Sequence, residues 1–120
     1  MTDALRWLAL GQGAYFFVTG VWPLLSMRTF EAVTGSKTDK WLVKTVGIQV
    51  GVVGLVLLLA GYRDRADAEV VTLAIGSALG LTAIDVWYTA RGVIPRIYLL
   101  DAAAEGLLIA AWTVAALSAN

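Results

Sequence analysis

The stretch that decides the fold covers residues 41–62 and reads WLVKTVGIQVGVVGLVLLLAGY. It is almost wholly apolar and carries a single charge, on Lys44. A helix needs ~20 apolar residues to cross a ~30 Å hydrocarbon core, so this run is long enough to span a membrane. Its apolar residues are continuous rather than alternating, which argues against a strand of a membrane barrel. The stretch therefore predicts a transmembrane α-helix.

Three further apolar runs predict helices over residues 4–26, 70–90 and 97–118. The first run is longer than the core of a cleaved signal peptide, so we expect it to be retained. The runs lack the polar outer face that a helix of a soluble bundle needs. Short connections make consecutive helices antiparallel. The sequence thus predicts an all-α, integral membrane four-helix bundle with antiparallel neighbours, which forms a single domain over residues 1–120.

Local signals refine the ends of these helices. Pro23 is expected to kink or close the first one. Residues 28–33 suit a short interfacial helix, and Thr38 or Asp39 suits the N-cap of the helix that follows. Pro95 favours a helix start just before residue 97.

The distribution of Lys and Arg predicts the orientation in the membrane. Short cytoplasmic loops carry an excess of these residues. The first and third connections, with the adjoining helix ends, carry six: Arg28, Lys37, Lys40, Lys44, Arg91 and Arg96. The termini and the second connection carry three: Arg6, Arg63 and Arg65. We therefore expect the first and third connections in the cytoplasm and both termini outside.

Composition excludes several function classes. The chain has nine basic and nine acidic residues and no net charge, so nothing indicates a nucleic-acid partner. It contains no cysteine, which excludes disulfide, thiol and iron–sulfur chemistry. It contains no histidine, which removes the usual haem, zinc and copper ligand and the commonest general base. We expect no cofactor, no metal site and no catalytic residues of a familiar kind.

Three carboxylates lie inside the predicted spans: Asp85, Asp101 and Glu105. An acidic residue at the centre of a membrane helix costs roughly 2.5–3.5 kcal/mol on insertion scales, so such residues usually have a function. Asp101 and Glu105 are four residues apart and share one helix face. All three are expected in the half of the bilayer next to the first and third connections. Glu105 lies deepest and is the strongest functional candidate.

Each predicted helix also carries a polar stripe, which should face the interior of the bundle. In the first helix, residues 12, 15, 19, 22 and 26 follow helical spacing. Together with the acids, the stripes predict a polar cavity that opens toward the first and third connections. The candidate ligand-binding or proton-linked residues are Glu105, Asp101, Asp85, Gln49, Gln12, Tyr15, Trp22, Trp87 and Tyr88.

A purely structural interpretation of these residues stays open. The acids would then pair with fixed internal charges, for which the candidates are Lys44, Arg28, Arg91 and Arg96. Gln12 and Gln49 would be interhelical hydrogen-bond partners, and the tryptophans would anchor the helices at the interface. The residues between Phe30 and Val43 would form either an ordinary capped connection or a lid over the cavity.

Small residues recur at four-residue spacing at Gly47 and Gly51, at Gly76 and Gly80, and at Ala102 and Gly106. Such pairs permit close contact between helices in lipid. They indicate packing within one bundle, with a homodimer interface as the alternative.

The segment FEAVTGSKTDKWLV (residues 30–43), with VWPLL (residues 21–25) before it, resembles small bacterial four-helix membrane proteins. The acid late in the third helix and the acids early in the fourth are broadly similar to the layout of DoxX-like proteins. The resemblance implies a four-helix bundle in a bacterial inner membrane and no assigned reaction. Small multidrug exporters are similar in size, but their essential glutamate lies in the first helix, and this first helix has no acid within its apolar run.

These observations support two main hypotheses of function. In the first, the carboxylate cluster binds or transports a small cationic or amphiphilic molecule, or protons. In the second, the chain is a structural or accessory subunit whose acids pair internally or with a partner membrane protein. A membrane enzyme that transfers protons with Asp or Glu is a weaker third hypothesis, because no nucleophile and base are paired in the sequence.

Overall fold

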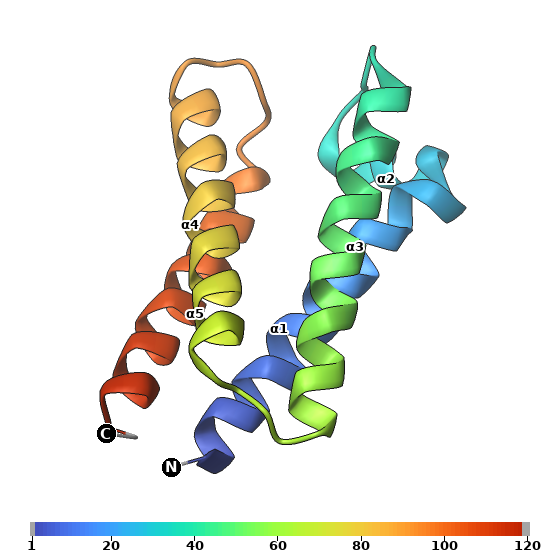
Figure 1. Ribbon diagram of the computed structural model, residues 1–120. Coiled ribbons are helices and arrows are strands. Elements are labelled where there is room, and N and C mark those ends of the chain that lie inside the picture. The colour runs from blue at the N-terminus through green and yellow to red at the C-terminus, as the bar shows by residue number, and fades with distance from the viewer. Residues whose placement is uncertain (1, 119–120) are drawn as a thin grey trace.

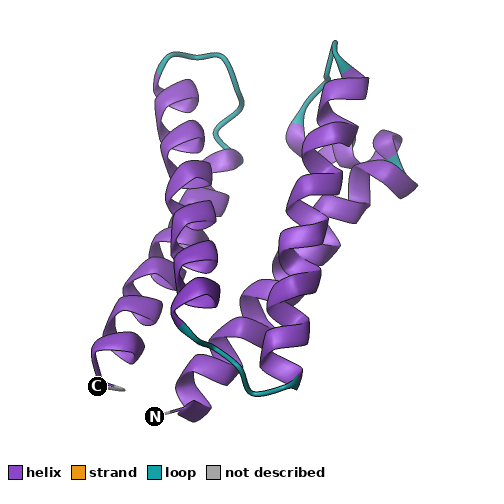
Figure 2. Ribbon diagram, in the orientation of Figure 1, coloured by secondary structure: helices purple, strands orange, loops and turns teal. Residues whose placement is uncertain are grey.

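The computed structural model describes residues 2–118, and within them every regular element is a helix (Figures 1 and 2). The helices are α1 (Thr2–Leu25), α2 (Met27–Thr34), α3 (Lys40–Tyr62), α4 (Ala68–Ala90) and α5 (Tyr98–Ser118). Four of them, α1, α3, α4 and α5, are long and apolar enough to cross a membrane. The prediction of an all-α chain with four such helices is confirmed.

The helix ends differ from the predicted ones by at most two residues. The short helix predicted over residues 28–33 is present as α2 and is one residue longer at each end. α1 ends two residues after Pro23, and the hydroxyl of Ser26 then caps α2 by accepting a hydrogen bond from the Thr29 N–H (3.3 Å). Asp39 takes the N-cap position of α3, although its side chain makes no capping hydrogen bond. Asp67, which the sequence did not single out, caps α4 by accepting from the Val70 N–H.

Glycines set the distance between α1 and α3, the two helices that contact each other most extensively. A Cβ placed on Gly13 would lie 2.7 Å from the Leu58 backbone nitrogen, and one placed on Gly20 would lie 2.6 Å from the Gly47 carbonyl oxygen. A Cβ placed on Gly54 would lie 2.7 Å from the Gly13 carbonyl oxygen. The two backbones are therefore in direct contact, which only glycine permits at these positions.

The predicted small-residue motifs divide into two groups. Gly47 and Gly51 face α1, as packing within the chain requires. Gly76, Gly80 and Gly106 face open space, where an added Cβ would meet no atom within 4 Å. The glycines at the contact between α1 and α3 follow a seven-residue spacing, from Gly13 to Gly20 and from Gly47 to Gly54, which identifies this interface better than the four-residue spacing does.

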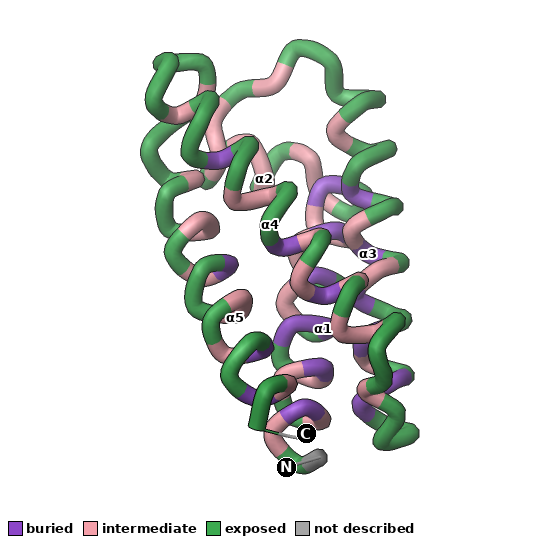
Figure 3. Tube along the Cα trace, turned by 60° about the vertical axis from the view of Figure 1, so that its left-hand side comes forward, coloured by how far each residue is buried: buried purple, intermediate pink, exposed green. Residues whose placement is uncertain are grey.

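α4 packs mainly on α5, and contact between this pair and the pair α1 and α3 is sparser. The termini and the second connection lie at one end of the molecule, and the first and third connections lie at the other (Figure 1). A core of buried residues joins the two pairs near the end with the termini: Leu5, Ala9, Leu57, Ala74, Trp112 and Ala115. Buried positions lie where helices face one another, and the outer faces are exposed (Figure 3). Because those outer faces are apolar, they suit lipid as their solvent.

The glycine contact generates a stability prediction. We expect Gly54→Ala to reduce the free energy of unfolding by about 1–3 kcal/mol, because the methyl group forces α1 and α3 apart. Gly76→Ala is the matched control, since its methyl group enters open space and alanine favours a helix. Unfolding by sodium dodecyl sulfate in mixed micelles measures both variants. Equal stability of the two variants would contradict the proposed backbone contact.

Candidate functional site

A cavity of about 770 Å³ lies at the end of the molecule formed by the first and third connections. All five helices and both connections contribute to its wall. Apolar side chains from α3 and α4 line much of it, among them Val46, Val50, Leu81 and Ile84. Its polar side chains come mainly from α1, α4, α5 and the segment 34–39. The cavity thus has an apolar body and a localised polar region.

The polar region contains the three carboxylates that the sequence singled out. Asp85 of α4 and Asp101 and Glu105 of α5 all line the cavity. Asp85 is 4% exposed and Glu105 is 1% exposed. Asp101 lies within interaction range of both, and its Oδ1 accepts a hydrogen bond from the Tyr15 hydroxyl of α1. The helix pairs therefore meet at this cluster through a phenol and a carboxylate.

The cluster contains acceptor oxygens that no donor reaches. Both carboxylate oxygens of Glu105 and the Oδ2 of Asp85 are buried, and no N–H or hydroxyl donor of the described residues reaches them; the Asp101 carboxyl is the neighbour within hydrogen-bond range of each acid. No ion pair among residues 2–118 involves any of the three acids. A buried carboxylate without a partner is costly, and it must be neutralised by a proton or by a bound cation. The arrangement can therefore hold either one.

The four predicted charge partners do not reach the cluster. Lys44, Arg28, Arg91 and Arg96 are all exposed. The Arg91 guanidinium lies over the Trp87 ring, 5.6 Å from its centroid, instead of approaching an acid. The structure thus brings the acids together without the cations that an internal salt-bridge network would need.

The other candidate residues lie in three different places. Tyr15 and Trp22 line the cavity beside the acids. Trp87 is 60% exposed, and Tyr88 is also exposed; neither lines the cavity. Gln49 lies outside the main cavity, at the rim of a smaller one between α3 and α4.

Gln12 is fully buried and makes hydrogen bonds between the helix pairs. Its Nε2 donates to the Ala74 carbonyl of α4 (3.0 Å), and its Oε1 accepts from the Trp112 indole of α5 (2.7 Å). All three residues lie in or beside the core near the end with the termini, away from the cavity. Gln12 therefore tethers α1 to α4 and α5. Trp112, which the sequence analysis did not single out, is its partner.

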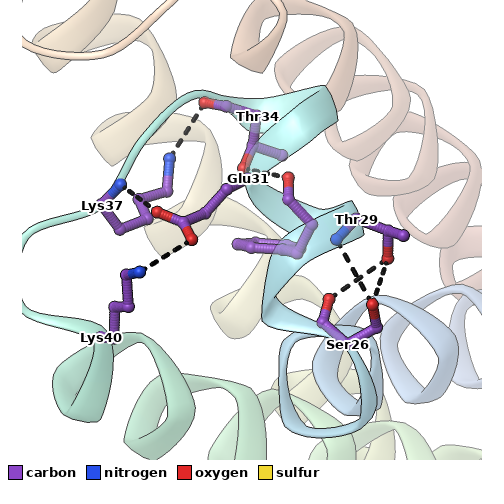
Figure 4. Close-up of polar contacts among 7 residues, drawn as sticks. Ser26, Thr29, Glu31, Thr34, Lys37 and Lys40 are labelled. Carbon is purple, nitrogen blue, oxygen red and sulfur yellow. Dashed lines mark hydrogen bonds and ion pairs between the residues drawn. The ribbon is translucent and has the colours of Figure 1, made fainter.

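Residues of the first connection line the mouth of the cavity. An ion pair and several hydrogen bonds hold this connection in place (Figure 4). Glu31 accepts a hydrogen bond from the Lys37 backbone N–H (2.7 Å) and forms an ion pair with the Lys40 ammonium (3.2 Å). The Lys37 ammonium donates to the Thr34 carbonyl (3.0 Å) and lies 5.0 Å from the centroid of the Tyr98 ring. Lys37 lines the mouth and was considered from the sequence only for the charge balance of the loops.

The two connections at this end also touch each other. Gly35 adopts φ +96°, a conformation that side-chain-bearing residues rarely take, and a Cβ there would lie 2.9 Å from the Cγ of Pro95. This contact and the Glu31 contacts form a cover, defined here as α2 with residues 35–39. These contacts fit both interpretations of the segment from Phe30 to Val43, an ordinary capped connection and a lid.

In residues 2–118 no three carboxylates converge in a geometry that could hold a metal ion. No protein-family model, curated protein or solved structure matches this chain. The resemblance to DoxX-like proteins therefore stays a prediction. The geometry and charge of the cavity are the observations from which a function can be proposed.

Glu31 generates a prediction about pH. The backbone N–H of Lys37, and secondly the Lys40 side chain, lower the pKa of Glu31 below its ordinary value of 4.5. Because the folded-state pKa is depressed, the stabilisation of the cover is complete above pH 4.5 and is lost as the pH falls through the lowered pKa. We expect the amide protection factor of Lys37, measured by NMR in micelles, to fall in that range. Glu31→Gln should lower it at neutral pH, and Glu69→Gln should not.

Gln12 generates a prediction about stability. Gln12→Leu removes the acceptor of the buried Trp112 N–H, which should cost about 1–3 kcal/mol of unfolding free energy. Gln49→Leu is the control, because the Gln49 side chain is exposed and makes no hydrogen bond among the described residues. Detergent unfolding followed by tryptophan fluorescence measures both. If the two variants lose the same free energy, Gln12 is not the tether described above.

Proposed function

We propose that this protein binds a small cationic or amphiphilic molecule, or carries it across the bilayer, through the cluster of Asp85, Asp101 and Glu105. The single observation that carries the proposal is the unpaired state of this cluster. Three acids line one cavity, and the Oδ2 of Asp85 and both carboxylate oxygens of Glu105 are reached by no N–H or hydroxyl donor within residues 2–118. An ion-paired structural cluster would contain its own cations, because an unpaired buried charge destabilises the fold.

The proposal includes the setting of the site in a membrane. We propose an antiparallel four-helix bundle in a bacterial inner membrane, with the first and third connections in the cytoplasm. Four helices of suitable length and hydropathy support the spanning part of this proposal. The excess of Lys and Arg in those two connections supports the orientation. The mouth of the cavity, with the cover across it, would then lie on the cytoplasmic side.

The rest of the cavity suits a ligand with both apolar and cationic parts. Trp22 and Phe30 meet edge to face at the wall, with ring centroids 5.4 Å apart. Aromatic faces attract organic cations, and apolar walls stabilise a hydrocarbon body by burial. A volume of about 770 Å³ lies in the range of small-molecule sites, ≈ 300–1,000 Å³.

The test uses phenethylamine, a compact aromatic amine, as the probe. We expect it to bind the protein in lipid nanodiscs, and we expect Glu105→Gln to weaken the affinity at least tenfold. The reason is that a hydrogen bond to a charged group contributes about 1.5–3 kcal/mol. Isothermal titration calorimetry measures the affinity.

Glu69→Gln is the matched control, because Glu69 is an exposed glutamate at the opposite end of α4. The variants are compared only after circular dichroism shows equal helix content. Equal affinity of the two variants, or no binding to the wild-type protein, would contradict the proposal. That result would favour an accessory subunit whose acids pair with a partner protein.

A further inference from the structure

A second cavity, of about 320 Å³, lies between α3 and α4. Its wall contains no charged side chain; residues such as Val53 and Gly80 line it. Gln49 and Gly80 are exposed, and both lie near the middle of their helices. In a protein that spans the membrane, this second cavity faces the hydrocarbon core of the bilayer.

The second cavity is adjacent to the main one. Four apolar side chains belong to the walls of both: Phe16, Val50, Leu81 and Ile84. α3 and α4 contact each other only sparsely, so no tight helix interface closes this side. An apolar chain that lay between these side chains would therefore occupy both cavities and reach the lipid.

The two approaches to the carboxylates differ in charge. On the side of the connections, the Lys37 ammonium and the Asp39 carboxylate line the mouth, and the cover and Pro95 lie across it. A ligand that entered from water would have to pass between these charged groups and the cover. On the side between α3 and α4, no ionisable side chain lines the approach. The uncharged wall and the sparse contact between α3 and α4 favour entry of an amphiphile from the lipid.

The second cavity and the carboxylate cluster lie at different depths along α4, as the chain and the head group of an amphiphile in one leaflet do. Gly80 lies near the middle of α4, and Asp85 lies five residues closer to the third connection. At 1.5 Å per residue this separation is about 7.5 Å along the helix. A chain seated beside Gly80 would thus place its head group at the carboxylates, nearer to the membrane surface, as in a lipid.

The unpaired acceptors define the head group. Three buried oxygens have no donor in the described residues, the two of Glu105 and the Oδ2 of Asp85. A primary ammonium brings a positive charge and N–H donors, both of which these oxygens lack. A quaternary ammonium would supply the charge and no donor.

We infer that the ligand of this protein is a single-chain primary amine, which enters from the bilayer between α3 and α4 and places its ammonium at Asp85 and Glu105. The inference rests on the proposed function, because it takes the carboxylate cluster to be the ligand site. It adds the route of entry, the apolar chain and the type of head group.

The experiment compares dodecylamine with phenethylamine, which fits the main cavity alone. Equilibrium binding of both is measured in lipid nanodiscs, with empty nanodiscs as background. Dodecylamine concentrates in the bilayer, from which the proposed route leads, so we expect its apparent affinity for wild-type protein, expressed per total amine, to be at least tenfold higher. Dodecanol, with the same chain and no charge, should bind at least tenfold more weakly than dodecylamine.

Gly80→Phe is the variant that blocks the proposed route, since its side chain enters open space beside the second cavity. We expect it to lower the ratio of dodecylamine to phenethylamine affinity at least tenfold. Gly76→Phe is the matched control, because Gly76 lies one turn away, also faces open space and lines neither cavity. It should leave the ratio within twofold of the wild type. Gly80→Leu repeats the test with a smaller side chain.

The outcomes separate this inference from the proposed function. If Gly80→Phe and Gly80→Leu keep the wild-type ratio, or if dodecanol binds as tightly as dodecylamine, the inference is overturned. The proposed function still stands in that case, provided that Glu105→Gln weakens phenethylamine binding. If neither amine binds above background, both are overturned.

Discussion

The hydrogen bonds of Gln12 are the interaction on which the rest of the structure depends. The amide joins the α1 and α3 pair to the α4 and α5 pair, because it contacts Ala74 and Trp112 at once. In an apolar interior an unsatisfied amide costs several kcal/mol, so the helices must keep the spacing that satisfies it. This constraint acts at one end only. The core residues gather around it, and at the opposite end the helix pairs meet through Tyr15 and Asp101 at the wall of the cavity.

The glycine contact between α1 and α3 makes that asymmetry possible. Where Gly13, Gly20 and Gly54 meet the facing backbone, α1 and α3 are in direct backbone contact. α4 and α5 pack on this pair through the core near the termini, and contact between α3 and α4 is sparse. The close contact within the first pair and the sparse contact between the pairs leave space at the end with the first and third connections, and the three acids line that space.

The sequence was sufficient to predict the elements and the chemistry of the interior. Continuous apolar runs predicted the four long helices, because helix length and hydropathy are local properties. Helical spacing predicted that Asp101 and Glu105 share a face, and both line the cavity with Asp85. The sequence could not predict which polar residue meets which. Gln12 and Tyr15 belong to one stripe, yet Gln12 meets Trp112 and Tyr15 meets Asp101, since pairing depends on how the helices are placed.

For the same reason, the sequence could not decide whether the three acids form ion pairs with the neighbouring Lys and Arg residues. Arg91 and Arg96 lie close to Asp85 and Asp101 along the chain, and proximity in sequence suggested ion pairs. Both cations sit at the polar end of the molecule, where their side chains stay exposed to solvent, and the acids lie deeper among apolar helices. An arginine that moved inward to an acid would lose its hydration. The attraction between the two charges offsets that loss of hydration free energy only when the geometry of the ion pair is good. The acids are therefore left for a proton or a ligand to neutralise, which is the property that distinguishes this cavity from a packed core.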